Sequence, residues 1–430
     1  MKVGGPTRRD VLRWTAFGGA GILVGACGDN ETLRPPGDGH AAAIFEPESD
    51  SFLVAVWALL SLAVGIEVRV VGEDDVVFAG FARIDTYRAV FQVTNLEPDT
   101  HYEITLETDD AVRMVHRART APRVDATRPV RIAVSADIDP HPEFISDLMA
   151  HVIDTEPELF VSIGDFPYTD NGPPALDVTT YRERHAQVRT EPRVRNLLEA
   201  MAVRAIYDDH EFRNDWDGMY AVTEAPRYAA AMQVWDEFFP LRSGGDIKYR
   251  SWRWGAHLEC FLLDCRRFRS PNAMADGPGK TMLGAAQRAW LLEKVQASTA
   301  TFKVVFSGVP LDFGDGNDHW SSFRDERNGI LDALVGVSGL LFVSGDQHWF
   351  AAQQHAHGIR EFQVGPLARG VGVPMTEAPG VQFRASRLNA GLIDVTADAL
   401  TFSGIGVGGE IFYRQTFSVA DLTPASLARR

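Results

Sequence analysis

Acidic and histidine side chains follow several short apolar runs of this 430-residue sequence, at the point where each run ends. The runs are residues 131–136, 159–164, 203–207 and 340–344, and the side chains after them are Asp137 and Asp139, Asp165 and Tyr168, residues 208–211, and Asp346 with His348. Because α/β folds place their active sites beyond the carboxyl ends of strands, we expect these side chains to converge. Carboxylate, phenolate and imidazole ligands suit iron, manganese, zinc or calcium rather than a soft-metal thiolate site.

Each of these residues has an ordinary structural explanation when it is taken alone. An acidic residue after a strand is commonly a helix cap or a turn residue, and His348 could be a buried histidine with satisfied hydrogen bonds. The order of the motifs favours a metal site. Binuclear metallophosphoesterases generally present Asp, then Gly-Asp, then Asn-His-Asp/Glu, and finally Gly-His-x-His. Residues 164–165, 209–211 and 345–348 resemble the last three steps in that order, with Asp replacing Asn and then His.

The same replacements occur in the PhoD-like alkaline phosphatase and phosphodiesterase family, which the sequence resembles over nearly all of its length after residue 43. The matching motifs are Gly-Asp-x-x-Tyr at 164–168, Asp-Asp-His-Glu at 208–211, Leu-Asp-x-Arg at 263–266, Met-Leu-Gly-x-x-Gln-x-x-Trp-Leu at 282–291, Asp-x-Trp at 318–320 and Ser-Gly-Asp-x-His at 344–348. One departure concerns Ala136, because iron-binding members usually have Cys there. The metal identity is therefore open, and Asp137, with Asp139 in reserve, is the expected ligand at this point.

The resemblance implies metal-dependent hydrolysis of phosphate monoesters, diesters or both by a metal-activated hydroxide. Asp165 is expected to bridge two or more cations, iron and/or calcium, with manganese or zinc as alternatives. The other expected ligands are Asp137, Tyr168, Asp346 and His348 in one site, and Asp209 with Asn214 in another. His210 is expected to act as the general acid for the leaving oxygen or as a donor to the phosphoryl oxygens.

Two further residues are weaker candidates for binding metal or substrate. Asp318 belongs to the Asp-x-Trp motif. Arg266 could hold a phosphate through bidentate hydrogen bonds, or it could pair with Asp264 at the end of a surface strand. The sequence leaves both roles of Arg266 open.

The elements that must position these residues alternate between strand and helix beyond residue 122. Strands are expected at 131–136, 159–164, 203–207, 247–254, 257–263, 302–307, 340–344, 361–364, 392–395 and 410–417, and helices at 143–154, 181–201, 227–238, 285–297 and 324–335. This alternation predicts a layered α/β domain with β-sheets flanked by helices. With the family resemblance, residues 128–420 are expected to form a metallophosphoesterase sandwich of this kind.

A small all-β sandwich is expected to precede that domain. Residues 44–122 contain short apolar runs separated by turn signals, and 102–106 alternate with period two. Residues 95–102 and 117–122 resemble the corner and closing strand of a fibronectin type III-like module. No residue here has metal-ligand character, so a structural or partner-binding role is expected.

The first 27 residues have the features of an export signal. Arg8-Arg9 precede a short, Gly-rich apolar run that ends at Val24-Gly25-Ala26-Cys27, which resembles a twin-arginine signal with a lipoprotein cleavage site. Residues 28–43 are expected to be a flexible tether. We therefore expect export by the twin-arginine route and a periplasmic or cell-surface protein that contacts the membrane only through a lipid on Cys27.

The overall charge limits the choice of partners. A formal net charge of −16, with no long Lys/Arg run, disfavours nucleic-acid binding and leaves a small phosphate ester as the expected substrate, since bound cations can reverse the local field. Two alternatives remain. One is a catalytically inactive, lipid-anchored binding or adhesion module on the same fold, and the other is action on phospholipids or cell-wall phosphodiesters.

Overall fold

The computed structural model describes residues 39–139, 144, 146–242, 245–312, 317–374 and 380–425. The predicted signal peptide, Cys27 and residues 28–38 of the predicted tether lie outside the described residues. The strands form three sheets, here called sheets A, B and C, with nine, seven and four strands. Among the described helices, none is long and apolar enough to cross a membrane.

Sheet A has the strand order β20-β19-β18-β8-β9-β10-β1-β2-β5. Its strands are β1 (His40–Phe45), β2 (Phe52–Ala58), β5 (Arg88–Val93), β8 (Val130–Ser135), β9 (Phe160–Ser162), β10 (Val203–Ala205), β18 (Asn389–Val395), β19 (Ala399–Gly406) and β20 (Ile411–Ser418). The three central strands β8, β9 and β10 run parallel, and nearly all of their side chains are buried. Parallel strands that are covered on both faces appear in a sequence as continuous apolar runs. For this reason these three strands could be predicted from the sequence.

Sheet B has the order β11-β12-β13-β14-β16-β15-β17, and sheet C the order β4-β3-β6-β7. The strands of sheet B are β11 (Arg250–Trp254), β12 (Leu258–Leu262), β13 (Phe302–Ser307), β14 (Leu340–Ser344), β15 (Phe350–Gln354), β16 (Arg360–Gln363) and β17 (Val381–Ala385). Those of sheet C are β3 (Ala63–Val70), β4 (Val76–Arg83), β6 (His101–Thr108) and β7 (Arg113–Arg119). In sheet B, strands β12, β13 and β14 are parallel.

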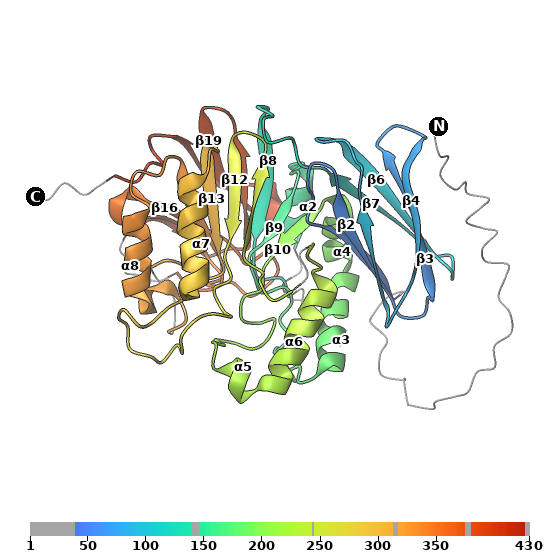
Figure 1. Cartoon of the computed structure of the whole chain (residues 1–430), viewed down its shortest axis with the longest axis horizontal. Coiled ribbons are helices and arrows are strands. Elements are labelled where there is room, and N and C mark those ends of the chain that lie inside the picture. Colours follow the sequence, from blue (N-terminus) through green and yellow to red (C-terminus); the bar gives the residue numbers. More distant parts are fainter. Residues whose placement is uncertain are drawn as a thin grey trace, which may run out of the picture.

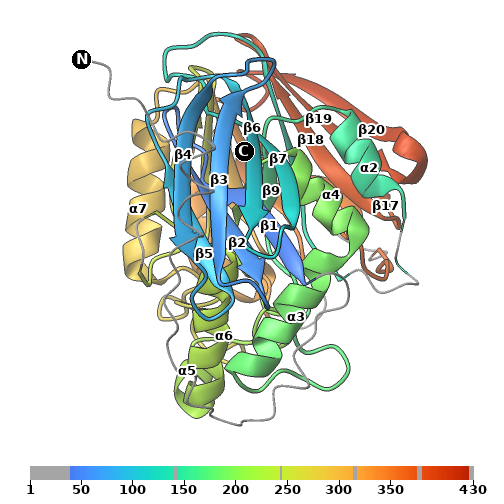
Figure 2. The same cartoon turned by 90° about the vertical axis from the view of Figure 1, so that its right-hand side faces the viewer.

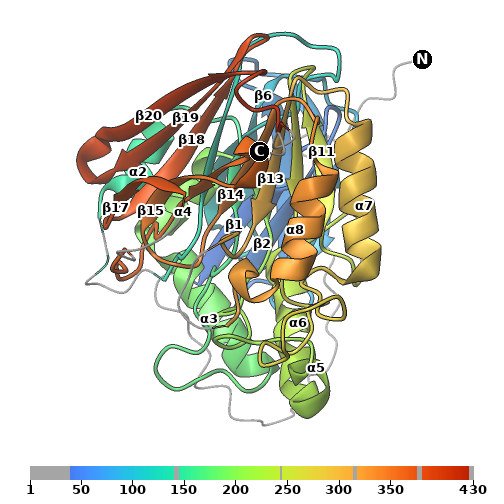
Figure 3. The same ribbon diagram turned by 90° about the vertical axis from the view of Figure 1, so that its left-hand side faces the viewer.

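Sheets A and B pack face to face, and helices cover both outer faces (Figures 1 and 3). The helices are α2 (Leu148–Asp154), α3 (Val178–Thr190), α4 (Pro192–Ala200), α5 (Tyr220–Thr223), α6 (Ala225–Phe238), α7 (Gly284–Ala297) and α8 (Arg324–Ala333). Helices α2, α3, α4 and α6 pack on sheet A, and α7 and α8 pack on sheet B. The layered sandwich predicted from the sequence is therefore present.

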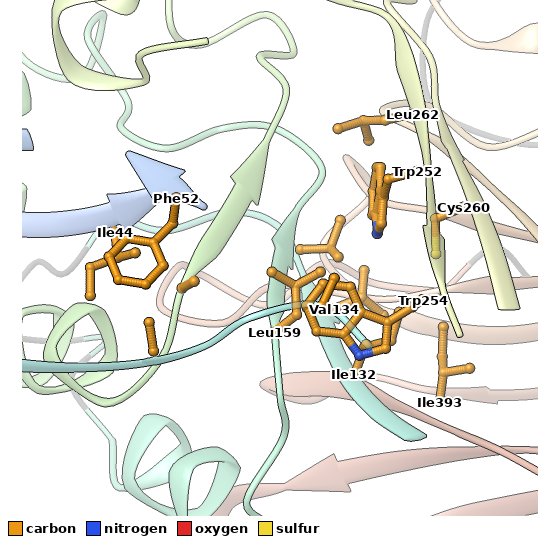
Figure 4. Close-up of a cluster of buried hydrophobic side chains, with 14 of the residues drawn as sticks. Ile44, Phe52, Ile132, Val134, Leu159, Trp252, Trp254, Cys260, Leu262 and Ile393 are labelled. Atoms are coloured by element: carbon orange, nitrogen blue, oxygen red, sulfur yellow. The ribbon is translucent and has the colours of Figure 1, made fainter. Parts of the chain in front are cut away.

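The layer between the two sheets is apolar. Figure 4 shows Ile132 and Val134 of sheet A close to Trp252, Trp254 and Cys260 of sheet B. All five side chains are at most 4% exposed. This packing holds the carboxyl ends of the parallel strands of both sheets at one edge.

The N-terminal β-sandwich is present but is not a separate unit. Sheet C packs against strands β1, β2 and β5, which extend sheet A (Figure 2). Strand β1 pairs in parallel with β10 through Phe45 and Val203, so one sheet runs through both predicted domains. The prediction from the sequence treated residues 44–122 as a self-contained sandwich, because a pairing between strands far apart in the chain leaves no local pattern.

Two local predictions were wrong. The tether was expected to end at residue 43, but strand β1 already begins at His40, and its Ala41 and Ala43 are buried against the helices. A single helix was expected over 181–201, but α3 and α4 are separated at Glu191, whose backbone is extended. Proline disfavours the α conformation of the residue before it, and Pro192 therefore starts a new helix with Glu191 as its N-cap.

Candidate metal centre

The candidate centre lies where the parallel strands of sheets A and B end. Loops after β8, β9 and β10 supply residues from sheet A, and loops after β12, β13 and β14 supply residues from sheet B. The structure groups their carboxylate and imidazole atoms into four sets of three. The sets are Asp137, Asp165 and His348; Asp165, Asp209 and His210; Asp208, Asp209 and Asp346; and Asp209, Asp215 and Asp318, with the atoms of each set within 4.8 Å of one another.

Tyr168 joins the first set. Its hydroxyl oxygen lies 2.6 Å from Nε2 of His348, 3.1 Å from Oδ2 of Asp165 and 3.3 Å from Oδ1 of Asp137. The Nδ1–H of His348 donates to the carbonyl oxygen of Gly370 at 2.8 Å, and Nε2 is directed at the set. The first set thus offers oxygen and imidazole donors from three strand ends, and Asp165 is shared with the second set, as a bridging ligand would be.

Asp346 lies in a different set from the one predicted. It was expected beside Asp137 and His348, but its carboxylate groups with Asp208 and Asp209. Residues two apart share a face only in an extended strand, whereas Asp346 and His348 have φ values of 76° and 58°. The chain turns between them, and their side chains part.

The reserve ligand Asp139 lies outside these sets, and Asn214, which was expected beside Asp209, has an exposed side chain. Asn214 is exposed, and its backbone N–H donates to Oδ2 of Asp170 at 2.7 Å; the adjacent Asp215 lies in the fourth set instead. Asp139 accepts a hydrogen bond from Asn171 and lies 3.8 Å from Nη1 of Arg369. Asp318, the other weak candidate, does lie in the fourth set.

The backbone at the candidate ligands is strained. Asp137, Asp165, Asp346 and His348 all have positive φ, between 56° and 76°. Non-glycine residues in this region cost free energy and persist where the surrounding structure enforces them, which is common at functional sites. Gly365 is part of that enforcement, because a Cβ there would lie 2.2 Å from Oδ2 of Asp137.

The carboxylates carry more negative charge than the surrounding protein neutralises. Asp137, Asp165 and Asp209 are at most 1% exposed, and Oδ2 of Asp137 and Oδ1 of Asp209 are buried with no hydrogen-bond partner. Burial raises the pKa of Asp165 well above its usual range, and the charges of Asp209 and Asp208 raise it further. Unpaired buried carboxylate oxygens are costly, and bound cations would satisfy them. The donor set therefore fits hard metal cations.

Comparison with known proteins agrees with this geometry. The model of the family described as "PhoD-like phosphatase" matches residues 142–378, more than half of the chain. The chain belongs to the PhoD-like phosphatase family.

One sequence relative and two solved structures resemble this PhoD-like chain. Alkaline phosphatase D of Bacillus subtilis (strain 168) is 24% identical over 305 residues, which are 60% of this chain and 52% of the relative, so the chain spans about half the length of that protein. A solved structure of PhoD covers 88% of both chains at 19% identity, with a TM-score of 0.77. Purple acid phosphatase PPD1 from yellow lupin (Lupinus luteus) seeds has 10% identity and a TM-score of 0.65, covering 91% of this chain and 78% of its own. The two structures show that the fold is shared.

The departure at Ala136 leaves the PhoD-like centre without a thiolate at that point. The Ala136 side chain is 1% exposed, and a Cβ on Gly345 would lie only 2.8 Å from its methyl carbon. The donors near this position are carboxylate, phenol and imidazole groups. A hard cation is the better match for such donors.

His210 has a partner that the sequence did not reveal. Its Nδ1–H donates to Oδ1 of Asp170 at 2.7 Å, and its ring centroid lies 4.1 Å from that of Tyr168. Burial opposes protonation, but Asp209 and Asp170 raise the pKa of His210 to about 9. With no cation on Asp209, His210 is therefore protonated at neutral pH. Asp170 lies two residues after the Gly-Asp-x-x-Tyr motif, and only that proximity could have pointed to it.

Glu211 supports the loops rather than facing the carboxylate sets. Its Oε1 accepts from the N–H of Phe166 at 2.8 Å, and its Oε2 accepts from the N–H groups of Asp165 and Asp208 at 3.1 and 3.0 Å. Burial raises the pKa of Glu211 to about 8. One side chain thus ties the loop after β9 to the loop after β10.

The guanidinium of Arg266 does not pair with Asp264 at a surface strand end, which was one of the two roles considered for it. It is fully buried, so it does not lie on a surface strand end, and its guanidinium is bound to Asp208. The side chain of Asp264 instead accepts from the hydroxyl of Tyr207 at 2.5 Å. An arginine after a strand carries no local sign of such burial, because the carboxylates around it come from other strand ends.

Proposed function

We propose that this chain hydrolyses phosphate esters with the help of two or more bound metal ions. Buried carboxylates with unpartnered oxygens lie together with Tyr168, His348 and a protonated His210 at one site. This convergence is the observation that carries the proposal. Membership of the PhoD-like phosphatase family supports it. Iron and/or calcium are the proposed metals, with manganese or zinc as alternatives, and a small phosphate monoester or diester is the proposed substrate.

The position of each residue indicates which cation it would bind. Asp137, Tyr168 and His348 would hold one cation and Asp209 another, with Asp165 shared between them. When bound, such cations supply Lewis-acid polarisation of the phosphoryl group and activation of the attacking water.

His210 completes the reaction on the leaving-group side. Asp170 accepts a hydrogen bond from the Nδ1–H of His210, and its negative charge favours the protonated ring. Its Nε2–H can therefore be donated to the leaving oxygen as the bond to phosphorus breaks. This requires no covalent phospho-enzyme.

The test is hydrolysis of p-nitrophenyl phosphate and bis-p-nitrophenyl phosphate by the purified protein, with metal content measured by mass spectrometry. Bound metal and activity that Asp165→Ala abolishes are expected, with Asp398→Asn, an exposed aspartate, as the matched control. The substrate ratio separates monoesterase from diesterase. A folded protein that binds no added iron, calcium, manganese or zinc and remains inactive would favour the binding-module alternative.

We also propose that the protein is exported by the twin-arginine route and anchored through a lipid on Cys27. Arg8-Arg9 and the small residues before Cys27 support this. Detergent-phase partitioning should retain the wild type and release Cys27→Ala to the aqueous phase. Equal partitioning of both proteins would refute the anchor.

A further inference from the structure

Arg266 lies at the base of the candidate centre with carboxylates on several sides. Its Nε and Nη2 donate to Oδ1 and Oδ2 of Asp208 at 2.7 and 2.6 Å, a bidentate pair. Its Nη1 lies 2.9 Å from Oδ2 of Asp318. Its Nη2 is also 3.6 Å from Oδ2 of Asp209 and 3.5 Å from Oδ1 of Asp346. Four carboxylates from three strand ends thus share one guanidinium.

The bond between Arg266 and Asp208 has no room to rearrange. A Cβ on Gly164 would lie 2.3 Å from Cβ of Asp208, and a Cβ on Gly308 would lie 2.4 Å from its Oδ1. The N–H of Asp208 is held by Oε2 of Glu211 at 3.0 Å. Asp208 is therefore fixed in a tight enclosure with both of its oxygens on the arginine.

The set of Asp208, Asp209 and Asp346 already contains a cation. By geometry alone the three carboxylates could hold a metal ion, but the guanidinium is within 3.6 Å of each of them. Arginine remains charged at all accessible pH values, whereas metal occupancy depends on supply. Among the described residues, no arginine or lysine pairs with the set of Asp137, Asp165 and His348, and an unpartnered oxygen of Asp137 lies there.

We propose that Arg266 is a positioning residue that acts as a built-in cation of the centre. It takes the place of a metal ion among Asp208, Asp209 and Asp346, and so limits metal binding to the two sets that contain Asp165. It also keeps the strand ends of both sheets assembled before any metal arrives. The metal part of this inference rests on the proposed function.

The first experiment measures metal stoichiometry and thermal unfolding of Arg266→Met beside the wild type. Equilibrium dialysis against Ca²⁺ or Mn²⁺ should show about one additional ion per chain in the variant, because the freed carboxylates then need a cation. After chelation, the variant should unfold about 10 °C lower than the wild type, and divalent cation should recover more of that loss than it adds to the wild type.

Arg269→Met is the matched control. Arg269 is also buried and lies on the same loop, but its Nε donates to the carbonyl of Cys265 at 2.6 Å and its Nη1 to Asn272 at 3.2 Å. This control should lose stability without gaining an ion. Equal metal counts in Arg266→Met and the wild type, with equal metal-dependent stabilisation, would overturn the proposal.

Two more variants make the result independent of a folding failure. Arg266→Lys keeps the charge and should keep the wild-type metal count, and an additional ion in it would contradict the proposal. In chelated protein, the double variant Arg266→Met/Asp208→Asn should recover much of the stability lost by Arg266→Met; no recovery would refute charge neutralisation even if no metal binds. Absence of metal from the wild type would instead refute the proposed function.

Discussion

Two buried charge networks in this protein differ in the sign of their excess charge, which is negative in one and positive in the other. In the candidate centre, seven aspartates form four overlapping sets, four of these aspartates pair with Arg266, and Asp137 and Asp209 keep unpartnered oxygens. In what we call the interdomain clamp, formed by Glu46, Arg204, Arg242 and Arg250, one glutamate contacts three arginines, two through its carboxylate and one through its backbone carbonyl, and Arg204 also pairs with Glu48. Glu46 bonds Arg204 at 2.7 Å and Arg250 at 2.6 Å, and its carbonyl accepts from Arg242 at 2.9 Å.

The pKa shifts of the two networks follow this balance. Burial alone would raise the pKa of Glu46, but Arg204 and Arg250 lower it below its ordinary value. Burial and neighbouring aspartates both raise the pKa of Asp165. A fully paired buried charge serves the fold, here joining β1 to β10 and β11, whereas unpaired buried charge is expected where a ligand is to bind.

The largest expected effect comes from Asp165→Asn. Loss of the shared ligand should reduce kcat/KM by about 1000-fold, equivalent to about 4 kcal/mol. The same change should raise the thermal midpoint of the chelated protein, because it removes a buried charge that its neighbours repel. Calorimetry of chelated protein checks this, and a lower midpoint than that of the wild type would break the comparison.

Glu46→Gln should act in the opposite way. It removes the carboxylate shared by the buried Arg204 and the half-buried Arg250, so the free energy of unfolding should fall by about 3 kcal/mol, while kcat of the folded protein stays unchanged. Urea unfolding measures the loss, with Glu293→Gln on the exposed face of α7 as the control. A loss no larger than in that control would mean that the clamp is not a stabilising network.

Asp170→Asn tests the orientation of His210. With phenyl phosphate, whose leaving group needs a proton, kcat should fall by about 100-fold, and with p-nitrophenyl phosphate by less than about 10-fold. Metal content should not change, since Asp170 contacts His210 and the N–H of Asn214. Equal losses with both substrates would argue against His210 as the general acid.

The smallest effect is the pH dependence of the clamp. The pKa of Glu46 is lowered from its ordinary value of 4.5, so the unfolded chain takes up this proton first as the pH falls. The contribution of Glu46 is therefore complete above pH 4.5 and is lost as the pH falls towards the folded-state pKa. The free energies of unfolding of the wild type and Glu46→Gln, measured with urea, should converge by about 1 kcal/mol between pH 5 and pH 3. A constant gap would contradict this.

Much of the layered domain could be predicted because its signals are local. Strand β13 and helix α7 lie within one residue of their expected bounds, since continuous apolar runs mark buried parallel strands and period-3.6 spacing marks surface helices. Placing Asp165, Asp209 and His348 at strand ends needed only the order of elements. The sequence of strand β4 gave no clear strand signal, because a half-exposed strand at the edge of a sheet has only a weak pattern of apolar residues.

The sequence by itself determined which side chains follow which strand, and so the chemistry available at one edge of the sheets. Only the tertiary structure decided how these side chains are grouped. In the folded protein, Asp346 lies in a different set from His348, and Asp170 accepts a hydrogen bond from His210. Carboxylates from several strand ends contact Arg266, and β1 pairs with β10. The physical reason is that a strand end is specified by neighbours in the chain, whereas the partners of a buried charge come from distant segments and depend on how two sheets pack.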